Sequence, residues 1–167
     1  QCLWCSNPES QSYQAEVMES PNRCIGCGAC RRACPSGAIA GEAGYIINRE
    51  LCDGCFKCVG ACFAESKRRA GKAYSVSEPF AEIAKDRAFY SMYGGGVTFS
   101  GGEPLTQPAF LAEIARKCRR NRMNVVVESC GLGDYGRFKC ALPYIDGMFM
   151  DIKHIDSARH RELTGQG

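Results

Sequence analysis

The pattern Cys-x-x-Cys-x-x-Cys-x-x-x-Cys occurs twice in this chain, and it constrains the fold more than any other feature of the sequence. The first copy is CIGCGACRRACP at residues 24–35, and the second is CDGCFKCVGAC at residues 52–62. In runs with this spacing, three cysteines hold one four-iron cluster and the fourth crosses to a second cluster. Short turns through Gly26, Gly28 and Gly54 would let the thiolates converge. The repeat therefore predicts a segment built around two [4Fe-4S] clusters.

The two predicted ligand sets interleave along the chain. They are Cys24, Cys27, Cys30 with Cys62, and Cys52, Cys55, Cys58 with Cys34. Zinc is the alternative, but zinc motifs usually place two CxxC pairs apart and do not need the additional cysteines at this spacing. The segment resembles two-cluster bacterial ferredoxins, in which a proline follows the last cysteine. Cys34 and Pro35 match that feature, whereas Phe63 follows Cys62.

The cysteine count favours metal binding over disulfides. The chain has 13 cysteines, an odd number, and ten of them lie between residues 2 and 62. This clustering suits chelation in a reducing compartment better than a secreted disulfide scaffold. Cys118, Cys130 and Cys140 are scattered, and we expect them to be buried thiols rather than ligands.

Charge and hydropathy give no sign of association with nucleic acid or with a membrane. The formal net charge of +3 assumes neutral thiols, so two thiolate-bound clusters would erase it. The charge is therefore no sign of a nucleic acid partner, and none is expected. The chain contains no long apolar run, and no leader precedes the first motif. These two observations predict no membrane segment and a cytoplasmic location. The basic stretch SKRRAGK at residues 66–72 is interpreted as a solvated connector.

Past residue 75 the chain changes to alternating helix and strand signals. Ser77 as a cap, with Pro79 in the first turn, predicts a helix that ends before Gly94. A strand at 97–100, a helix that starts at Thr106 and Pro108, a strand at 124–129, a short helix and a strand at 147–153 follow. This order predicts an α/β fold with parallel strands, either a barrel or an open doubly wound sheet.

Polar residues gather where each of these strands ends. SGGEP occupies residues 100–104, ESCG residues 128–131 and DIKH residues 151–154. The carboxyl ends of parallel strands carry the functional sites in both architectures. GGGVTFSGGEP is not a phosphate loop, because Gly102 stands where a Walker motif needs lysine. A plain glycine turn between strand and helix is the structural alternative.

The combination of CLWC at residues 2–5, the two cysteine runs, GGGVTFSGGEP and DIKH resembles the radical S-adenosylmethionine (radical SAM) enzymes that activate glycyl radical enzymes. The likeness implies a partial radical SAM (β/α) barrel with an inserted bacterial ferredoxin-like 2[4Fe-4S] domain. The expected boundaries are 1–17 for the end of the cluster loop, 18–75 for the insert and 76–167 for the partial barrel. In that family CxxxCxxC holds the site cluster, so we expect the first cysteine, the first strand and the later strands to lie outside this chain, and the chain alone to be inactive.

The same resemblance implies a role for each matching residue. Cys2 and Cys5 would be ligands of the site cluster, Trp4 would lie near the adenine, and Lys153 would pair with the cofactor's carboxylate. The residues expected to hold the amino and methionyl ends of S-adenosylmethionine, with a monovalent cation as a further candidate, are Gly101, Gly102, Glu103, Glu128, Ser129 and Asp151. A zwitterionic group needs acceptors for its ammonium and a cation for its carboxylate. For Asp151 and Lys153, which share a strand face, an ordinary ion pair is the alternative.

The implied activity is reductive cleavage of S-adenosylmethionine and formation of a glycyl radical on a partner enzyme. The implied cofactors are three [4Fe-4S] clusters in the full-length protein and S-adenosylmethionine. The implied partners are a glycyl radical enzyme and a flavodoxin or ferredoxin as electron donor, in an anaerobic cell. Two alternatives stay open: a two-cluster electron-transfer protein, and a radical SAM enzyme that acts on a small molecule. About twelve irons in the full-length protein would favour an activase and about eight an electron carrier.

Overall fold

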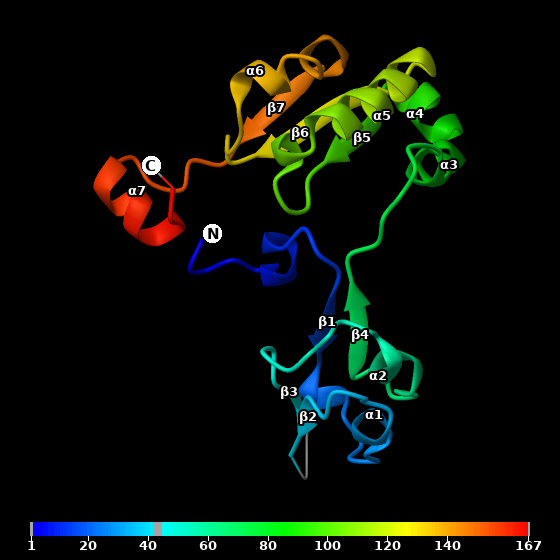
Figure 1. Ribbon diagram of the computed structural model, residues 1–167. Helices are drawn as coiled ribbons and strands as arrows, with labels where there is room; N and C mark the ends of the chain where they lie inside the picture. The colour runs from blue at the N-terminus through cyan, green and yellow to red at the C-terminus, as the bar shows by residue number, and fades with distance from the viewer. Residues whose placement is uncertain (1, 42–44, 167) are drawn as a thin grey trace. The chain divides into compact units, whose positions relative to one another are not determined.

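The computed structural model describes residues 2–41 and 45–166, and it divides into two compact units (Figure 1). One unit is Ser12–Lys72, which contains both cysteine runs. The other combines Gln1–Gln11 with Ala73–Gly167. The CLWC segment therefore belongs to the same unit as the parallel strands, although the cysteine-rich unit separates them in the sequence.

The cysteine-rich unit consists of two small antiparallel pairs and two short helices. β1 (Glu16–Glu19) pairs with β4 (Lys67–Ala70), and β2 (Ile39–Ala40) pairs with β3 (Ile46–Ile47). A 3-10 turn, η2 (Pro21–Arg23), precedes the first cysteine run. Each run then passes into a single helical turn, α1 (Ala29–Arg32) in the first copy and α2 (Lys57–Gly60) in the second. The sequence repeat is therefore also a structural repeat.

The core of this unit forms between the two helical turns and the strands. Its buried members are Val17, Cys30, Ile39, Ile47 and Cys58. The three glycines that the sequence marked as turns, at positions 26, 28 and 54, all have positive φ angles. Gly28 and its counterpart Phe56 in the second copy both take the left-handed conformation just before a helix. That conformation is unusual for an aromatic residue, and Phe56 lies beneath the guanidinium of Arg69, 4.5 Å from the ring centre.

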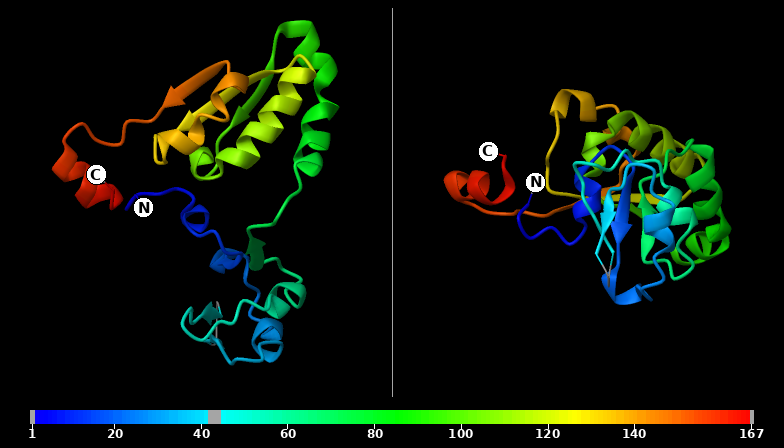
Figure 2. Two further views of the ribbon diagram at one scale, coloured as in Figure 1. Left: turned by 45° about the horizontal axis from the view of Figure 1, so that its top comes forward. Right: turned by 60° about the horizontal axis from the view of Figure 1, so that its bottom comes forward.

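The second unit contains a three-stranded parallel sheet in the order β5-β6-β7. The strands are β5 (Gly96–Phe99), β6 (Asn124–Ser129) and β7 (Gly147–Met150). Helix α5 (Pro108–Arg120) connects the first two, while α6 (Tyr135–Phe138) and the turn η4 (Leu142–Tyr144) connect the last two. Figure 2 shows the helices gathered on one face of this sheet. The prediction of parallel βα units is confirmed.

The buried side chains of α5 explain why the helix packs on this face. Leu111, Ala112, Ile114, Ala115 and Cys118 are all buried, at the i, i+3, i+4 spacing that makes one apolar stripe. They meet Val125 and Val127, which alternate along β6 and have no exposed surface. Each completely buried aliphatic side chain contributes about 1.5–3 kcal/mol to burial free energy. The sheet is therefore stabilised mainly by the packing of α5 on one of its faces.

Four details of the predicted elements were wrong. The helix expected from Ser77 to Gly94 is two helices, α3 (Ser77–Lys85) and α4 (Arg87–Tyr93), which break at Asp86. Ser77 does not cap it; the N–H and hydroxyl of Ser75 donate to Glu78 Oε2, across 2.8 and 2.9 Å, and close the first turn. Thr106 belongs to a separate turn, η3 (Pro104–Thr106), and β7 ends at Met150 instead of residue 153.

The connector expected at residues 66–72 was also misinterpreted. Residues 67–70 form β4, paired in register with β1, and both Ser66 and Lys67 are only 3% exposed. The positive charges had suggested a solvated chain. The side chain of Lys67 can be buried because its ammonium forms an ion pair with the carboxylate of Glu19.

Two further elements complete the second unit. η1 (Pro8–Gln11) follows the CLWC segment, and α7 (Ser157–Thr164) follows the third strand. The backbone N–H of Leu3 donates to the carbonyl of Leu163 across 3.0 Å, which ties the two segments together. None of the helices in the described part of the chain has the length and hydropathy needed to cross a membrane.

Candidate functional site

The structure brings the cysteines of the cysteine-rich unit (Ser12–Lys72, the expected ferredoxin-like insert and hence the ferredoxin-like unit) together in two separate hollows. The first is lined by Cys24, Cys27, Cys30 and Cys62, with Tyr45, Ser66 and Lys67 among its other walls. Cys62 lies in the second run of the sequence but lines the hollow of the first. The four cysteines are those of the first predicted ligand set.

The second hollow is the counterpart of the first. Cys34 comes from the first run, whereas Cys52, Cys55 and Cys58 come from the second. Val17, Ile39, Ile47 and Phe56 make most of its remaining wall, so it is more apolar than the first. The arrangement matches the second predicted ligand set.

The chemistry of these donors fits four-iron clusters. Within residues 2–41 and 45–166, no three His, Cys, Asp or Glu side chains converge as they would on a single metal ion. A four-iron cluster takes one thiolate on each iron, so its ligands surround a group instead of converging on a point. Among these cysteines, Cys30 and Cys58 are buried, whereas Cys27 and Cys55 are exposed.

The local environment affects the thiols unequally. Burial raises the pKa of Cys30 and of Cys58 above the ordinary thiol value. The hydroxyl of Ser36, 3.5 Å from the Cys34 sulfur, lowers the pKa of that thiol. Because ligation needs thiolates, the two buried cysteines become good ligands only when iron replaces their protons.

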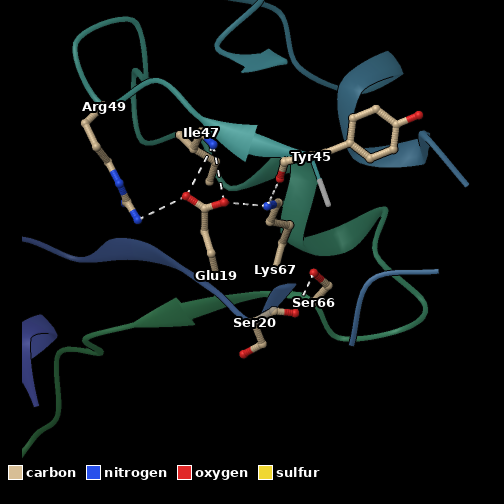
Figure 3. A network of polar contacts seen from close by, with 7 residues as sticks. All are labelled: Glu19, Ser20, Tyr45, Ile47, Arg49, Ser66 and Lys67. Carbon is tan, nitrogen blue, oxygen red and sulfur yellow. Dashed lines mark hydrogen bonds and ion pairs between the residues drawn. The ribbon is translucent and has the colours of Figure 1, made fainter. Parts of the chain in front are cut away.

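A buried ion pair lies beside the first hollow (Figure 3). The ammonium of Lys67 donates to Glu19 Oε2 across 2.7 Å and also to the carbonyl of Tyr45. Glu19 in turn accepts from the N–H of Ile47 and lies 3.5 Å from the guanidinium of Arg49. Glu19 and Lys67 occupy directly paired positions of β1 and β4. Sequence reasoning missed this pair because it placed Lys67 in a connector.

At the carboxyl edge of the parallel sheet, the carboxylate of Glu103 connects two strand ends. Its Oε1 accepts from the N–H of Leu105 at 3.0 Å and from the hydroxyl of Ser129 at 2.7 Å. Its Oε2 accepts from the N–H and the thiol of Cys130, at 2.9 and 3.0 Å. Burial and then this carboxylate raise the pKa of the Cys130 thiol. Two lone pairs on each oxygen are thereby used.

The loop that carries Glu103 depends on its glycines. Gly101 has a φ of +109°, a region that residues with a Cβ rarely occupy. Gly102 lies against Ser10 of η1, in the same amino-terminal stretch (residues 2–11) as Cys2 and Cys5, since a Cβ built on this glycine would be 3.1 Å from the Ser10 Cβ. The SGGEP loop therefore contacts the segment that bears Cys2 and Cys5.

Lys153 lies near the same group of residues. Its ammonium bonds to the carboxylate of Asp151, which raises the pKa of the lysine; Cys2 and Cys130 are close enough to raise it slightly further. The side chain is 22% exposed, whereas that of Asp151 is 62% exposed. Lys153 thus lies near both Cys2 and Cys130.

The remaining candidates do not all face the same way. Ser129 is buried on the face covered by α5 and bonds to Glu103. Glu128 alternates with it along β6 and is exposed on the other face, in register with Phe149 of β7. Cys2 and Cys5 are half-buried, and Trp4 is 49% exposed.

Cys130 is the residue that sequence reasoning undervalued. It was expected to be an isolated buried thiol, whereas both its N–H and its thiol bond to Glu103. Its position directly after Ser129 at a strand end was the available signal. Cys118 is buried as expected, while Cys140 is exposed and its thiol donates to the carbonyl of Arg137 across 3.1 Å.

Two family models match the chain. The model described as "4Fe-4S dicluster domain" matches residues 16–63. The model described as "4Fe-4S single cluster domain" matches residues 48–162, which is more than half of the chain. The matches support iron-sulfur clusters as the groups held by the cysteine hollows.

Curated proteins resemble almost the whole chain. An isethionate sulfite-lyase activating enzyme of Nitratidesulfovibrio vulgaris is 40% identical over 98% of this chain and 55% of its own length. A (2S)-3-sulfopropanediol sulfolyase activating enzyme of Bilophila wadsworthia is 38% identical over 99% and 56%. A trans-4-hydroxy-L-proline dehydratase activating enzyme of Clostridioides difficile is 36% identical, with the same coverage of each chain. The chain spans about half the length of these relatives.

Proposed function

Because the chain belongs to the 4Fe-4S single cluster domain family and its relatives at 36–40% identity are activating enzymes of glycyl radical enzymes, we propose that the complete protein is such an activase. It would cleave S-adenosylmethionine reductively and generate a glycyl radical on a partner enzyme. The parallel three-stranded sheet would be part of a radical SAM (β/α) barrel. An anoxic cytoplasm would suit it, since an iron-sulfur cluster with an open iron is vulnerable to oxygen.

The observation that carries the proposal is the position of the CLWC segment. Although about 60 residues of the ferredoxin-like unit intervene, the turn η1, which directly follows this segment, packs against the SGGEP loop through Ser10 and Gly102. Cys2 is also close enough to Lys153 to influence its pKa. Two candidate cluster ligands, a glycine loop and a cation thus belong to one unit, as a site for cofactor and cluster together requires.

The residues divide the work of binding between them. Cys2 and Cys5 would hold the site cluster, and Lys153 would attract the carboxylate of the bound amino acid group. The backbone of Gly101 and Gly102 would accept from its ammonium, while Ser129 and Cys130 hold Glu103 in place. Glu128, on the uncovered face, and Asp151, just after β7, would meet the methionyl end, with a monovalent cation if one binds. Trp4 would lie against the adenine.

The site cluster, held by Cys2 and Cys5, would supply one electron for cleavage of the sulfonium to methionine and a 5′-deoxyadenosyl radical, and this radical would remove a hydrogen atom from a glycine Cα of the partner. The protein's own task is to hold the sulfonium in one orientation and to exclude side reactions. The clusters held in the two hollows of the ferredoxin-like unit would relay electrons from a flavodoxin or ferredoxin to the site cluster. They would not contact the substrate.

A two-cluster electron carrier is the second candidate. The dicluster match and the two cysteine hollows favour it, since both describe an electron-transfer module. It gives no role to Cys2, Cys5 or Lys153. Counting iron and assaying cleavage of S-adenosylmethionine in the full-length protein separates the two functions. A glycyl radical signal in a candidate partner, measured by electron paramagnetic resonance, separates an activase from an enzyme that acts on a small molecule.

A further inference from the structure

The two hollows of the ferredoxin-like unit differ in the charge beside them. Lys67 lines the hollow of Cys24, Cys27, Cys30 and Cys62. Apart from cysteines, the titratable residue that lines the other hollow is Asp53. The repeat thus places a cation beside one site and an anion beside the other. Nothing in the repeated cysteine pattern requires this difference.

The surroundings of Lys67 keep its charge effective. Its side chain is 3% exposed, so water screens it little. Glu19 offsets part of the charge, but Glu19 does not line the hollow and is shared with Arg49. One carboxylate between two cations leaves a net positive charge, and of these three residues Lys67 is the one that lines the hollow. Figure 3 shows the carboxylate between the two cationic side chains.

The charges at the second hollow are weaker. Asp53 is exposed, and it accepts from the N–H of Cys55 across 3.1 Å. Lys57, which lies between Cys55 and Cys58 in the sequence, and Arg69, which covers Phe56, are exposed as well. Exposed charges are screened by water and by salt. The buried cation at the first hollow therefore dominates the difference between the sites.

Reduction of a four-iron cluster adds one electron and hence one negative charge. A buried cation nearby stabilises the reduced form more than the oxidised form and so raises the reduction potential. We propose that Lys67, held by Glu19, makes the cluster of Cys24, Cys27, Cys30 and Cys62 the higher-potential member of the pair. An electron from a one-electron donor then resides preferentially on that cluster. This proposal rests on the occupancy of the two hollows and is independent of the activase function.

The test is a redox titration of the full-length, cluster-loaded protein, followed by electron paramagnetic resonance with dithionite as reductant. Lys67→Met removes the charge and keeps most of the apolar stem. We expect it to lower the higher of the two ferredoxin-type potentials, with a change of roughly tenfold in the ratio of reduced to oxidised cluster, or about 59 mV for a one-electron couple. The lower potential should stay unchanged.

Glu19→Gln is the complementary variant, and it should move the same potential upward because Lys67 then loses its counter-charge. Opposite shifts at one cluster distinguish electrostatics from general disruption of the fold, which would not change sign. Lys57→Met is the matched control, since this exposed lysine lies within the other cysteine run, and we expect little change in either potential.

Three results would overturn the proposal: no shift in either variant, shifts of the same sign in both, or movement of the lower potential alone. If Lys67→Met fails to retain iron, the sign of the shift in Glu19→Gln decides the question by itself. Cleavage of S-adenosylmethionine, measured on the same samples, reports on the activase proposal separately, since it depends on Cys2 and Cys5.

Discussion

The hydroxyl of Ser129 donates to Oε1 of Glu103 across 2.7 Å, and this bond joins the loop after β5 to the end of β6. Cys130 supplies two more donors to the same carboxylate. Because all lone pairs of Glu103 are in use, an incoming ammonium group would have to displace one of these donors or bind to backbone carbonyls instead. Glu103 thus organises the strand ends.

Replacing Glu103 with Gln should loosen this edge of the sheet. An amide offers one acceptor oxygen in place of two, so the partly buried N–H of Cys130 loses its partner, at a cost of up to about 1–3 kcal/mol. The amide of Cys130 should exchange with solvent faster, by about tenfold for each 1.4 kcal/mol lost, and binding of S-adenosylmethionine should weaken.

Glu113→Gln is the control for this change. Glu113 forms an exposed i,i+3 pair with Arg116 on α5, worth roughly 0.5 kcal/mol or less. Its hydrogen exchange and cofactor affinity should match those of the wild type. If Glu103→Gln behaves like this control, Glu103 does not organise the site.

Cys2 and Cys130 should differ in iron content when replaced by Ala. In the full-length protein, Cys2→Ala should lower the count from about twelve irons to about eight, because the site cluster loses a ligand. Cys130→Ala should retain all of the iron, since this thiol bonds to Glu103. Loss of iron in Cys130→Ala would make it a ligand and contradict the assignment.

The interleaved ligand sets predict which cysteine variants lose the same cluster. Cys62→Ala should abolish the same cluster signal as Cys24→Ala, although Cys62 is closer in sequence to Cys58. Cys34→Ala should abolish the same signal as Cys52→Ala. Spectra of the four variants check this directly. Pairing of Cys62 with the second run would show that the two runs act separately.

Cys118 and Cys140 should differ in reactivity toward thiol reagents. Cys118 is completely buried, and burial raises its pKa to about 11, whereas Cys140 is exposed. Because it is accessible, Cys140 should be labelled readily, while Cys118 should stay unlabelled in the folded protein. Peptide mass spectrometry after timed labelling measures both. Rapid labelling of Cys118 without denaturant would contradict its burial.

The same thiol predicts a pH dependence of stability. Between pH 9.0 and about 11 the unfolded chain loses the Cys118 proton and the folded chain keeps it. Since the unfolded state then binds fewer protons, this residue's contribution is present below that window and is lost as pH rises through it. Cys118→Ala should show a weaker loss of stability over this range, as measured by denaturant unfolding at several pH values.

The sequence predicted the parallel strands and the cysteine hollows because both depend on local patterns. The apolar stripe of α5 and the alternation in β6 specify which faces pack, and cysteine spacing specifies which thiols can share a cluster. Lys67 escaped prediction because its burial depends on Glu19, 48 positions away in the sequence. The bonds of Glu103 to Ser129 and Cys130 likewise join residues 26 and 27 positions apart, which no local pattern indicates.

The most direct test of the central claim is anaerobic incubation of the reconstituted full-length protein with S-adenosylmethionine and dithionite, with iron counted on the same sample. An activase should contain about twelve irons and form methionine and 5′-deoxyadenosine. About eight irons with no cleavage of S-adenosylmethionine would contradict it and leave a two-cluster electron carrier.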